Sequence, residues 1–142
     1  PLFFFFSAGD SHLLHTIRIP VTNSQSEFDE QIGHLTKLLV DSLNERELEA
    51  RAGVLKEGTK GISKLAGFLE TTQFPERNSI VQFLRDLQTL RSTGSAHRKG
   101  SGYERIIAKL GVDPDRKSDA FRRILEEAVT AIISLRLYYC ER

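Results

Sequence analysis

Apolar residues recur at helical spacing along most of the chain, and the first such stretch is the longest. From Phe28 to Leu43 they follow one another at steps of three and four, which places them on one face of a helix. Ser24 precedes Glu27 by three positions, the spacing of a capping box, in which the serine hydroxyl accepts a hydrogen bond from a free backbone N–H. The pattern predicts a single helix from about residue 27 to residue 52, ended by a glycine.

The same periodicity predicts shorter and longer helices in the remainder of the chain. Pro75 suits the first turn of one of them, and Ser118 is a candidate N-cap for the last long one. The expected fold is all-α: an antiparallel helical bundle of about four to five helices, with its two longest helices antiparallel. The apolar stripes of these further helices run over residues 62–69, 80–90, 103–110 and 121–135.

Residues 1–23 do not follow this pattern. Leu13, His15, Ile17 and Ile19 alternate with other residues, which is a weak strand signal, and Pro20 ends it. A lone strand has no sheet to join, so we expect a short extended arm that packs on the helices or on a neighbour. Because the chain contains no methionine, this arm is interpreted as the remnant of an upstream region. Residues 24–142 then form the helical domain.

The composition, 39% hydrophobic and 27% charged over 142 residues, is that of a soluble globular domain. Lys and Arg total 20 and Asp and Glu total 19, so total charge gives no argument for nucleic-acid binding. The single cysteine, Cys140, excludes an intramolecular disulfide and fits a reducing, cytoplasmic location. The longest apolar run, from Leu2 to Phe6, is far too short to cross a membrane, so no membrane partner is expected.

Local charge gathers at one joint, "LRSTGSAHRKGSGYER" at positions 90–105. From Arg85 to Lys109 there are six Lys or Arg residues against two acidic ones. The joint is either a flexible basic loop between two helices or a site of phosphate chemistry. Its Lys and Gly stand in the wrong order for a P-loop, and no strand precedes it, which excludes nucleotide triphosphate binding of that kind.

Arg91 occupies an unusual position at this joint. It follows Leu87 by four positions and Ile80 by eleven, which places it on the apolar stripe of its helix. A guanidinium directed at a core is costly unless it is paired or reaches a cleft. Three interpretations remain: the side chain extends to water where the helix ends, it pairs with a carboxylate such as Glu126 or Glu127, or it lines a crevice that holds an anion.

His97 follows Arg91 by six positions, and Gly94 between them allows the helix to break and the two side chains to approach. Such a pair suits RNA chemistry: the imidazole moves the proton of a 2′-hydroxyl or of the leaving oxygen, and the guanidinium stabilises the charge on the phosphorane. This chemistry requires no metal ion and no cofactor. The residues expected to contact phosphate or bases beside the pair are Arg98, Lys99, Tyr103 and Arg105.

A helical bundle with "LQTLRSTGSAHRKG" at the end of an apolar helix resembles HEPN domains, the higher eukaryotes and prokaryotes nucleotide-binding group. Many of these carry an Arg-x4–6-His motif and act as metal-independent endoribonucleases (hydrolases) in toxin–antitoxin and antiphage defence systems. The resemblance implies Arg91 as the phosphate-contacting arginine and His97 as the acid–base histidine. Because the family usually assembles its motif between two protomers, it also implies a homodimer, with RNA and an antitoxin or upstream domain as partners.

Three functions stay open at this point. The first is the ribonuclease, a domain of a larger defence or toxin-type protein. The second is a non-catalytic module that dimerises or binds nucleic acid for an upstream domain, and it is favoured by the neutral net charge and by Ser92, where the family often has Asn, Asp or His. The third is a purely structural helical domain, because amphipathic stripes indicate a core and no particular task.

Overall fold

The computed structural model describes residue 4 and residues 11–52, 61–94 and 100–140. Within these residues every regular element is helical and no strand is present, which confirms the all-α prediction. None of the helices in this described part is long and apolar enough to cross a membrane. In chain order, the elements are η1 (Ser11–Thr16), α1 (Gln25–Thr36), η2 (Lys37–Asp41), α2 (Glu45–Ala52), α3 (Gly61–Thr71), α4 (Arg77–Gly94), α5 (Ser101–Lys109) and α6 (Lys117–Tyr139).

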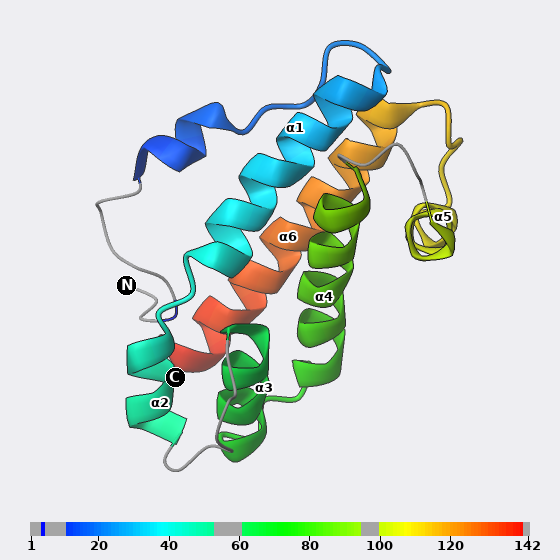
Figure 1. Cartoon of the computed structure of the whole chain (residues 1–142). Helices are drawn as coiled ribbons and strands as arrows, with labels where there is room; N and C mark the ends of the chain where they lie inside the picture. Colours follow the sequence, from blue (N-terminus) through cyan, green and yellow to red (C-terminus); the bar gives the residue numbers. More distant parts are fainter. Residues whose placement is uncertain (1–3, 5–10, 53–60, 95–99, 141–142) are drawn as a thin grey trace.

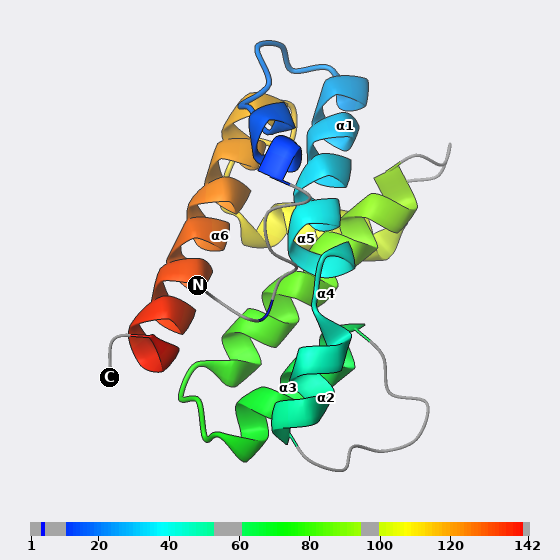
Figure 2. The ribbon, with the colours of Figure 1, turned by 90° about the vertical axis from the view of Figure 1, so that its left-hand side faces the viewer.

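Helix α1 lies at the centre of the bundle and packs against both α4 and α6 (Figures 1 and 2). In Figure 1, α1 and α6 run from top to bottom, whereas α4 runs from bottom to top. The two helices expected to be longest, the one beginning near residue 27 and the last one, therefore run parallel, but the two longest helices of the structure, α4 and α6, are antiparallel. Helices α2 and α3 pair at one end, and α5 packs on α4. The predicted stripes supply the core, and their fully buried members include Phe28, Ile32, Leu35, Leu87, Leu90 and Phe121.

The single helix predicted over residues 27–52 is divided in two. After α1, the five-residue π-helical turn η2 adds a residue to the turn, and the chain breaks before α2 begins. Asn44 marks the new start, because its side-chain oxygen accepts from the backbone N–H of Glu47 at 3.3 Å. Leu43 before the break and Leu48 after it are both buried, so the chain on each side of the break contributes to the core. The break could not be predicted from the apolar stripe, because Leu43 follows Leu39 by four positions, as it would in an unbroken helix.

Residues 11–23 lie against α1, and their first element is the 3₁₀ helix η1, not a strand. Gln31 of α1 is buried, and its side-chain amide donates to the carbonyl of Thr16 at 3.3 Å while its oxygen accepts from the backbone N–H of Arg18 at 2.8 Å. Pairing both groups of a buried amide avoids the cost of an unsatisfied polar group. The arm is thus bonded to the helices, which is one of the two arrangements the sequence left open.

Of the two predicted N-cap serines, one caps its helix and the other does not. Ser24 caps α1 as expected, accepting from the Glu27 backbone N–H at 3.3 Å. Ser118 does not cap α6: its hydroxyl donates to the carbonyl of Pro20 at 2.7 Å, and its backbone N–H donates to the side chain of Asn23 at 3.1 Å. The first turn of α6 is therefore capped by an asparagine distant in sequence.

Candidate functional site

Arg91 lies near the C-terminal end of α4 and reaches across to the end of η2. Its Nη1 is 2.6 Å from Oδ2 of Asp41, and the two side chains are 33% and 47% exposed. The guanidinium is therefore paired with a carboxylate, as one interpretation of the sequence held, but the partner is neither Glu126 nor Glu127. Both of those glutamates are exposed on α6, whereas Arg91 is directed to the junction of α1 with α2.

The π-helical turn η2 ends at Asp41 and thereby presents the carboxylate to Arg91. Its wider turn is closed by the backbone N–H of Ser42, which donates to the carbonyl of Lys37 at 3.1 Å, and the Ser42 hydroxyl donates to the same oxygen at 2.9 Å. Single π turns inside helices occur frequently at functional sites. The sequence did not indicate Asp41 as the partner of Arg91. Helical spacing places each residue on a face by assuming 3.6 residues per turn, and the π turn changes the face on which Asp41 lies.

The Asp41–Arg91 pair is too exposed to contribute much to stability. Half-exposed ion pairs are screened by water and typically contribute between about 0 and 1 kcal/mol. Its main consequence is orientation, because one nitrogen of the guanidinium is fixed while the group has five N–H donors in all. Among the described residues, no partner other than Asp41 accepts from this side chain. A guanidinium with exposed donors is a group that binds oxyanions in proteins.

The segment that carries the remainder of the predicted motif, residues 95–99, lies outside the described residues, and with it His97, Arg98 and Lys99. Its two ends are described. Helix α4 ends at Gly94, as predicted for a helix that breaks there, and α5 begins at Ser101 after an extended Gly100. The helices are close at this point, since a Cβ added to Gly102 would lie 3.3 Å from the Thr89 methyl group. Residues 95–99 therefore stand in the sequence between two helices that pack on one another.

Tyr103 and Arg105, the two predicted contacts on α5, are placed differently. Tyr103 is only 5% exposed, its ring meets Phe28 edge-on at 6.5 Å, and its hydroxyl accepts from the side chain of Gln25 at 2.9 Å. Burial also raises the pKa of this phenol. The expectation that Tyr103 offers a face for base stacking is therefore wrong, because the ring belongs to the core. Arg105 is exposed and remains available to an anion.

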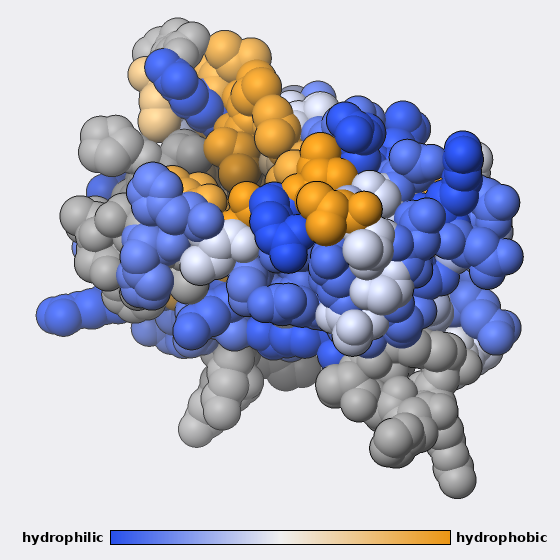
Figure 3. Space-filling view, turned by 90° about the horizontal axis from the view of Figure 1, so that it is seen from above, coloured by the Kyte–Doolittle hydropathy of each residue, from blue (hydrophilic) through white to orange (hydrophobic). Residues whose placement is uncertain are grey.

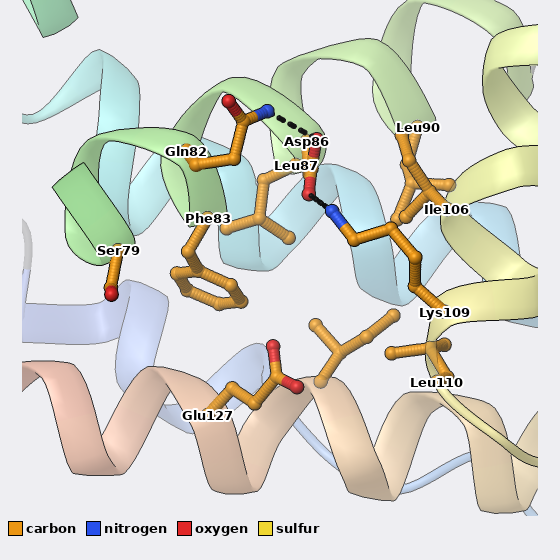
Figure 4. Close-up of a pocket in the computed structure, with 11 residues that line it drawn as sticks. Ser79, Gln82, Phe83, Asp86, Leu87, Leu90, Ile106, Lys109, Leu110 and Glu127 are labelled. Carbon is orange, nitrogen blue, oxygen red and sulfur yellow. Dashed lines mark hydrogen bonds and ion pairs between the residues drawn. The ribbon is translucent and has the colours of Figure 1, made fainter.

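A separate hollow of about 210 Å³ lies between α4, α5 and α6 (Figure 4). Its walls are mainly apolar, and the Lys109 ammonium group donates to Asp86 at its edge at 2.9 Å. Gln82 donates to the same carboxylate at 2.9 Å. Neither Arg91 nor Arg105 lines this hollow, so the predicted residues and the cavity do not coincide. The lining consists of Ser79, Gln82, Phe83, Asp86, Leu87, Leu90, Ile106, Lys109, Leu110, Ile124 and Glu127.

In the described residues, no group of three or more His, Cys, Asp or Glu side chains lies close enough together to hold a metal ion. Compared with protein-family models, curated proteins and solved structures, the chain matches none of them. The geometry around Arg91 is consequently the main basis for a function.

Proposed function

We propose that this chain is a metal-independent endoribonuclease domain in which Arg91 contacts the scissile phosphate and His97 transfers the proton. The observation that carries the proposal is the placement of Arg91. It comes from the apolar stripe of α4, is oriented by Asp41, keeps a third of its side chain exposed and stands four positions before the start of the segment that carries His97.

The reaction balances within the RNA and these two side chains. The 2′-hydroxyl loses its proton and its oxygen attacks the adjacent phosphorus, while the bond from phosphorus to the 5′ oxygen breaks and that oxygen takes a proton. The products are a 2′,3′-cyclic phosphate and a 5′-hydroxyl, and no water is consumed. The His97 imidazole serves one of the two proton transfers, because histidine is the side chain most often used for general acid–base catalysis. The guanidinium of Arg91 stabilises the negative charge that develops on the phosphorane.

Charge around the joint supports an RNA substrate. Exposed Arg105 lies on α5 directly after the joint, and Arg98 and Lys99 follow His97 in sequence. Single-stranded RNA is held largely through its phosphates, so such a cluster suffices for weak binding despite the nearly neutral chain. The reducing interior of a cell, with an antitoxin or upstream domain as a regulator, fits this activity.

The test is cleavage of an end-labelled single-stranded RNA in excess EDTA. Intact protein should cut it, and His97→Ala and Arg91→Ala should each lower the rate by about a hundredfold or more, the usual contribution of general acid–base or charge-stabilising groups. His15→Ala is the matched control, because His15 is an exposed histidine on η1 and should leave the rate unchanged. Equal cleavage by all four proteins would contradict the proposal.

A second candidate, RNA binding without cleavage, is favoured by one observation. Asp41 compensates the charge of Arg91 in the described structure, which weakens the attraction of this arginine for a phosphate. In that case intact protein should retard the same RNA in a gel without cutting it, and Arg105→Ala should weaken this retention whereas His97→Ala should not.

A further inference from the structure

The hollow between α4, α5 and α6 adjoins a second one that lies between α4 and α6. The second hollow has a volume of about 480 Å³ and shares three lining residues with the first: Ser79, Phe83 and Glu127. We call the 210 Å³ space the first hollow and the 480 Å³ space the second hollow. Hydrophilic side chains cover much of the surface around the bundle, as the view from above shows (Figure 3), so a recess with apolar walls is distinctive.

The walls of the first hollow belong to the protein core. Leu87, Leu90, Ile106 and Ile124 line it, and each of them is at most 4% exposed. At roughly 30 Å³ for each water-sized group, a volume of about 210 Å³ has room for about seven heavy atoms. Apolar walls favour an apolar occupant over water, so an aliphatic chain of about six carbon atoms suits this space.

Carboxylates outnumber cations around the two hollows, and both cations are already paired. Nζ of Lys109 is 2.9 Å from Oδ2 of Asp86. Nη1 of Arg123 is 4.0 Å from Oε2 of Glu126. No described residue forms an ion pair with either of the two remaining carboxylates, so the lining attracts a cation and not an anion. The acidic lining residues are Glu76, Asp86, Glu126 and Glu127, and the basic ones are Lys109 and Arg123.

Glu127 is the acidic residue that lines both hollows. Figure 4 shows its carboxylate directed from α6 toward the ring of Phe83 on α4. An ammonium group placed between them meets a carboxylate and an aromatic ring, and both attract it. Asp86 does not compete for this ammonium group, because its two oxygens accept from Gln82 and from Lys109, each at 2.9 Å.

We propose that this groove binds a small primary amine in its protonated form, with the ammonium group between Glu127 and Phe83 and an aliphatic chain of about six carbon atoms in the first hollow. The charge of Glu127 selects a cation, and the apolar walls select an aliphatic chain. Neither Arg91 nor Arg105 lines either hollow, so this site goes beyond the proposed ribonuclease activity and the two proposals can fail independently.

The experiment is a titration of the full chain at pH 7, followed through the methyl signals in nuclear magnetic resonance spectra. The probes are hexylamine, hexanol and hexanoate, which share their chain length and differ in charge. Hexylamine should shift the signals of Ile106 and Ile124 to saturation, with a dissociation constant of the order of millimolar. Ile62 of α3 lines neither hollow and should not shift. Hexanol should bind about fivefold more weakly, and hexanoate more weakly still.

The variant Glu127→Gln tests the ammonium subsite, because it removes the charge and keeps the shape of an exposed side chain. It should weaken hexylamine by about fivefold and leave the affinity for hexanol unchanged. Glu104→Gln is the matched control: Glu104 is exposed on α5 and lines neither hollow, so this variant should bind as the intact protein does. Three outcomes would each overturn the proposal: equal affinity for the three probes, a Glu127→Gln variant that still prefers hexylamine to hexanol, or no saturable shift of Ile106 and Ile124.

Discussion

Arg91 and Asp41 are fifty positions apart in the chain, and no sequence spacing connects them. The two side chains meet because α4 packs against η2. Both side chains also remain partly exposed to water. A buried pair would indicate structure alone, whereas a half-exposed one leaves guanidinium donors for a ligand. At the scale of the residue, Asp41 is therefore a positioning group for Arg91.

Replacing Asp41 by asparagine should separate these two roles. Asp41→Asn keeps the shape of the side chain and removes its charge, so the free energy of unfolding should change by less than about 1 kcal/mol. The rate of RNA cleavage should fall by about tenfold, because the guanidinium is no longer held in one orientation. The measurements are chemical denaturation and the EDTA cleavage assay, with Asp115→Asn, an exposed aspartate in a turn, as the control.

A larger loss of stability in Asp41→Asn, with cleavage per folded molecule unchanged, would show that the pair is structural and that Arg91 does not depend on it for function.

At the scale of the element, the helix starts determine how the N-terminal arm and the bundle hold together. Asn23, which lies just before α1, caps α6. Glu27, in the first turn of α1, accepts from the backbone N–H of Thr22 at 3.1 Å. Arg18 adds an ion pair to the same carboxylate at 3.4 Å. One short segment thus satisfies donors at the beginning of two helices and in the arm.

Asn23→Ala should destabilise the protein by about 1 kcal/mol, the usual cost of losing an N-cap, although Asn23 lies far in sequence from the helix it caps. Thermal unfolding followed by circular dichroism measures this. The control is Asn78→Ala on an exposed position of α4, where alanine favours the helix and no loss is expected. An unchanged unfolding midpoint for Asn23→Ala would refute the long-range cap.

Glu27 should make part of the stability dependent on pH. The Thr22 N–H is the largest cause that lowers the pKa of this carboxyl below its ordinary value of 4.5, and Arg18 acts in the same direction. Because the folded-state pKa is the lower one, the stabilisation is present above about pH 4.5 and is lost as the pH falls through the folded-state pKa. Glu27→Gln should therefore unfold more easily than the intact protein at pH 7, with the difference shrinking at pH 3.

Unfolding in denaturant at the two pH values measures this difference. Glu30→Gln, an exposed glutamate on the same helix, should show no such change. A difference for Glu27→Gln that is equal at both pH values would contradict the assignment.

At the scale of the whole molecule, an aromatic cluster closes one end of the bundle. Phe4, from the start of the chain, is fully buried and meets Phe68 of α3 and Tyr139 of α6 edge-on, at ring-centroid distances of 5.5 and 5.1 Å. The Tyr138 hydroxyl donates to the carbonyl of Thr72 at 2.8 Å in the same region. The beginning of the chain, the turn after α3 and the end of α6 are therefore held together.

Phe4→Ala should cost about 3–5 kcal/mol, the range for removing a fully buried phenylalanine, if the arm is an integral part of the domain. Leu14→Ala, at an exposed position of the same arm, should cost little. Urea denaturation of both variants measures the contrast. Equal stability of the two variants would show that the bundle folds without the beginning of the chain.

Sequence periodicity predicted the core well because burial follows the helical repeat: Phe28, Ile32 and Leu35 are all buried as their spacing requires. Periodicity did not predict the features that depend on contacts between distant parts of the chain. The break after Asp41 preserves the apolar spacing and so leaves no local signal, and a cap supplied by Asn23 cannot be read from the sequence around Ser118. Of the predicted site residues, only Arg91 was marked by a local conflict in the sequence, a cation on an apolar stripe.

The most direct test of the central claim uses two RNAs that differ in one oxygen atom. After the cleavage position is mapped in excess EDTA, the ribose on the 5′ side of that phosphate is replaced by 2′-deoxyribose, which removes the proposed nucleophile. We predict that cutting at that position stops while binding of the RNA is retained, and that the natural RNA yields a 2′,3′-cyclic phosphate. Continued cutting of the deoxy-substituted RNA would contradict 2′-hydroxyl attack directed by Arg91 and His97.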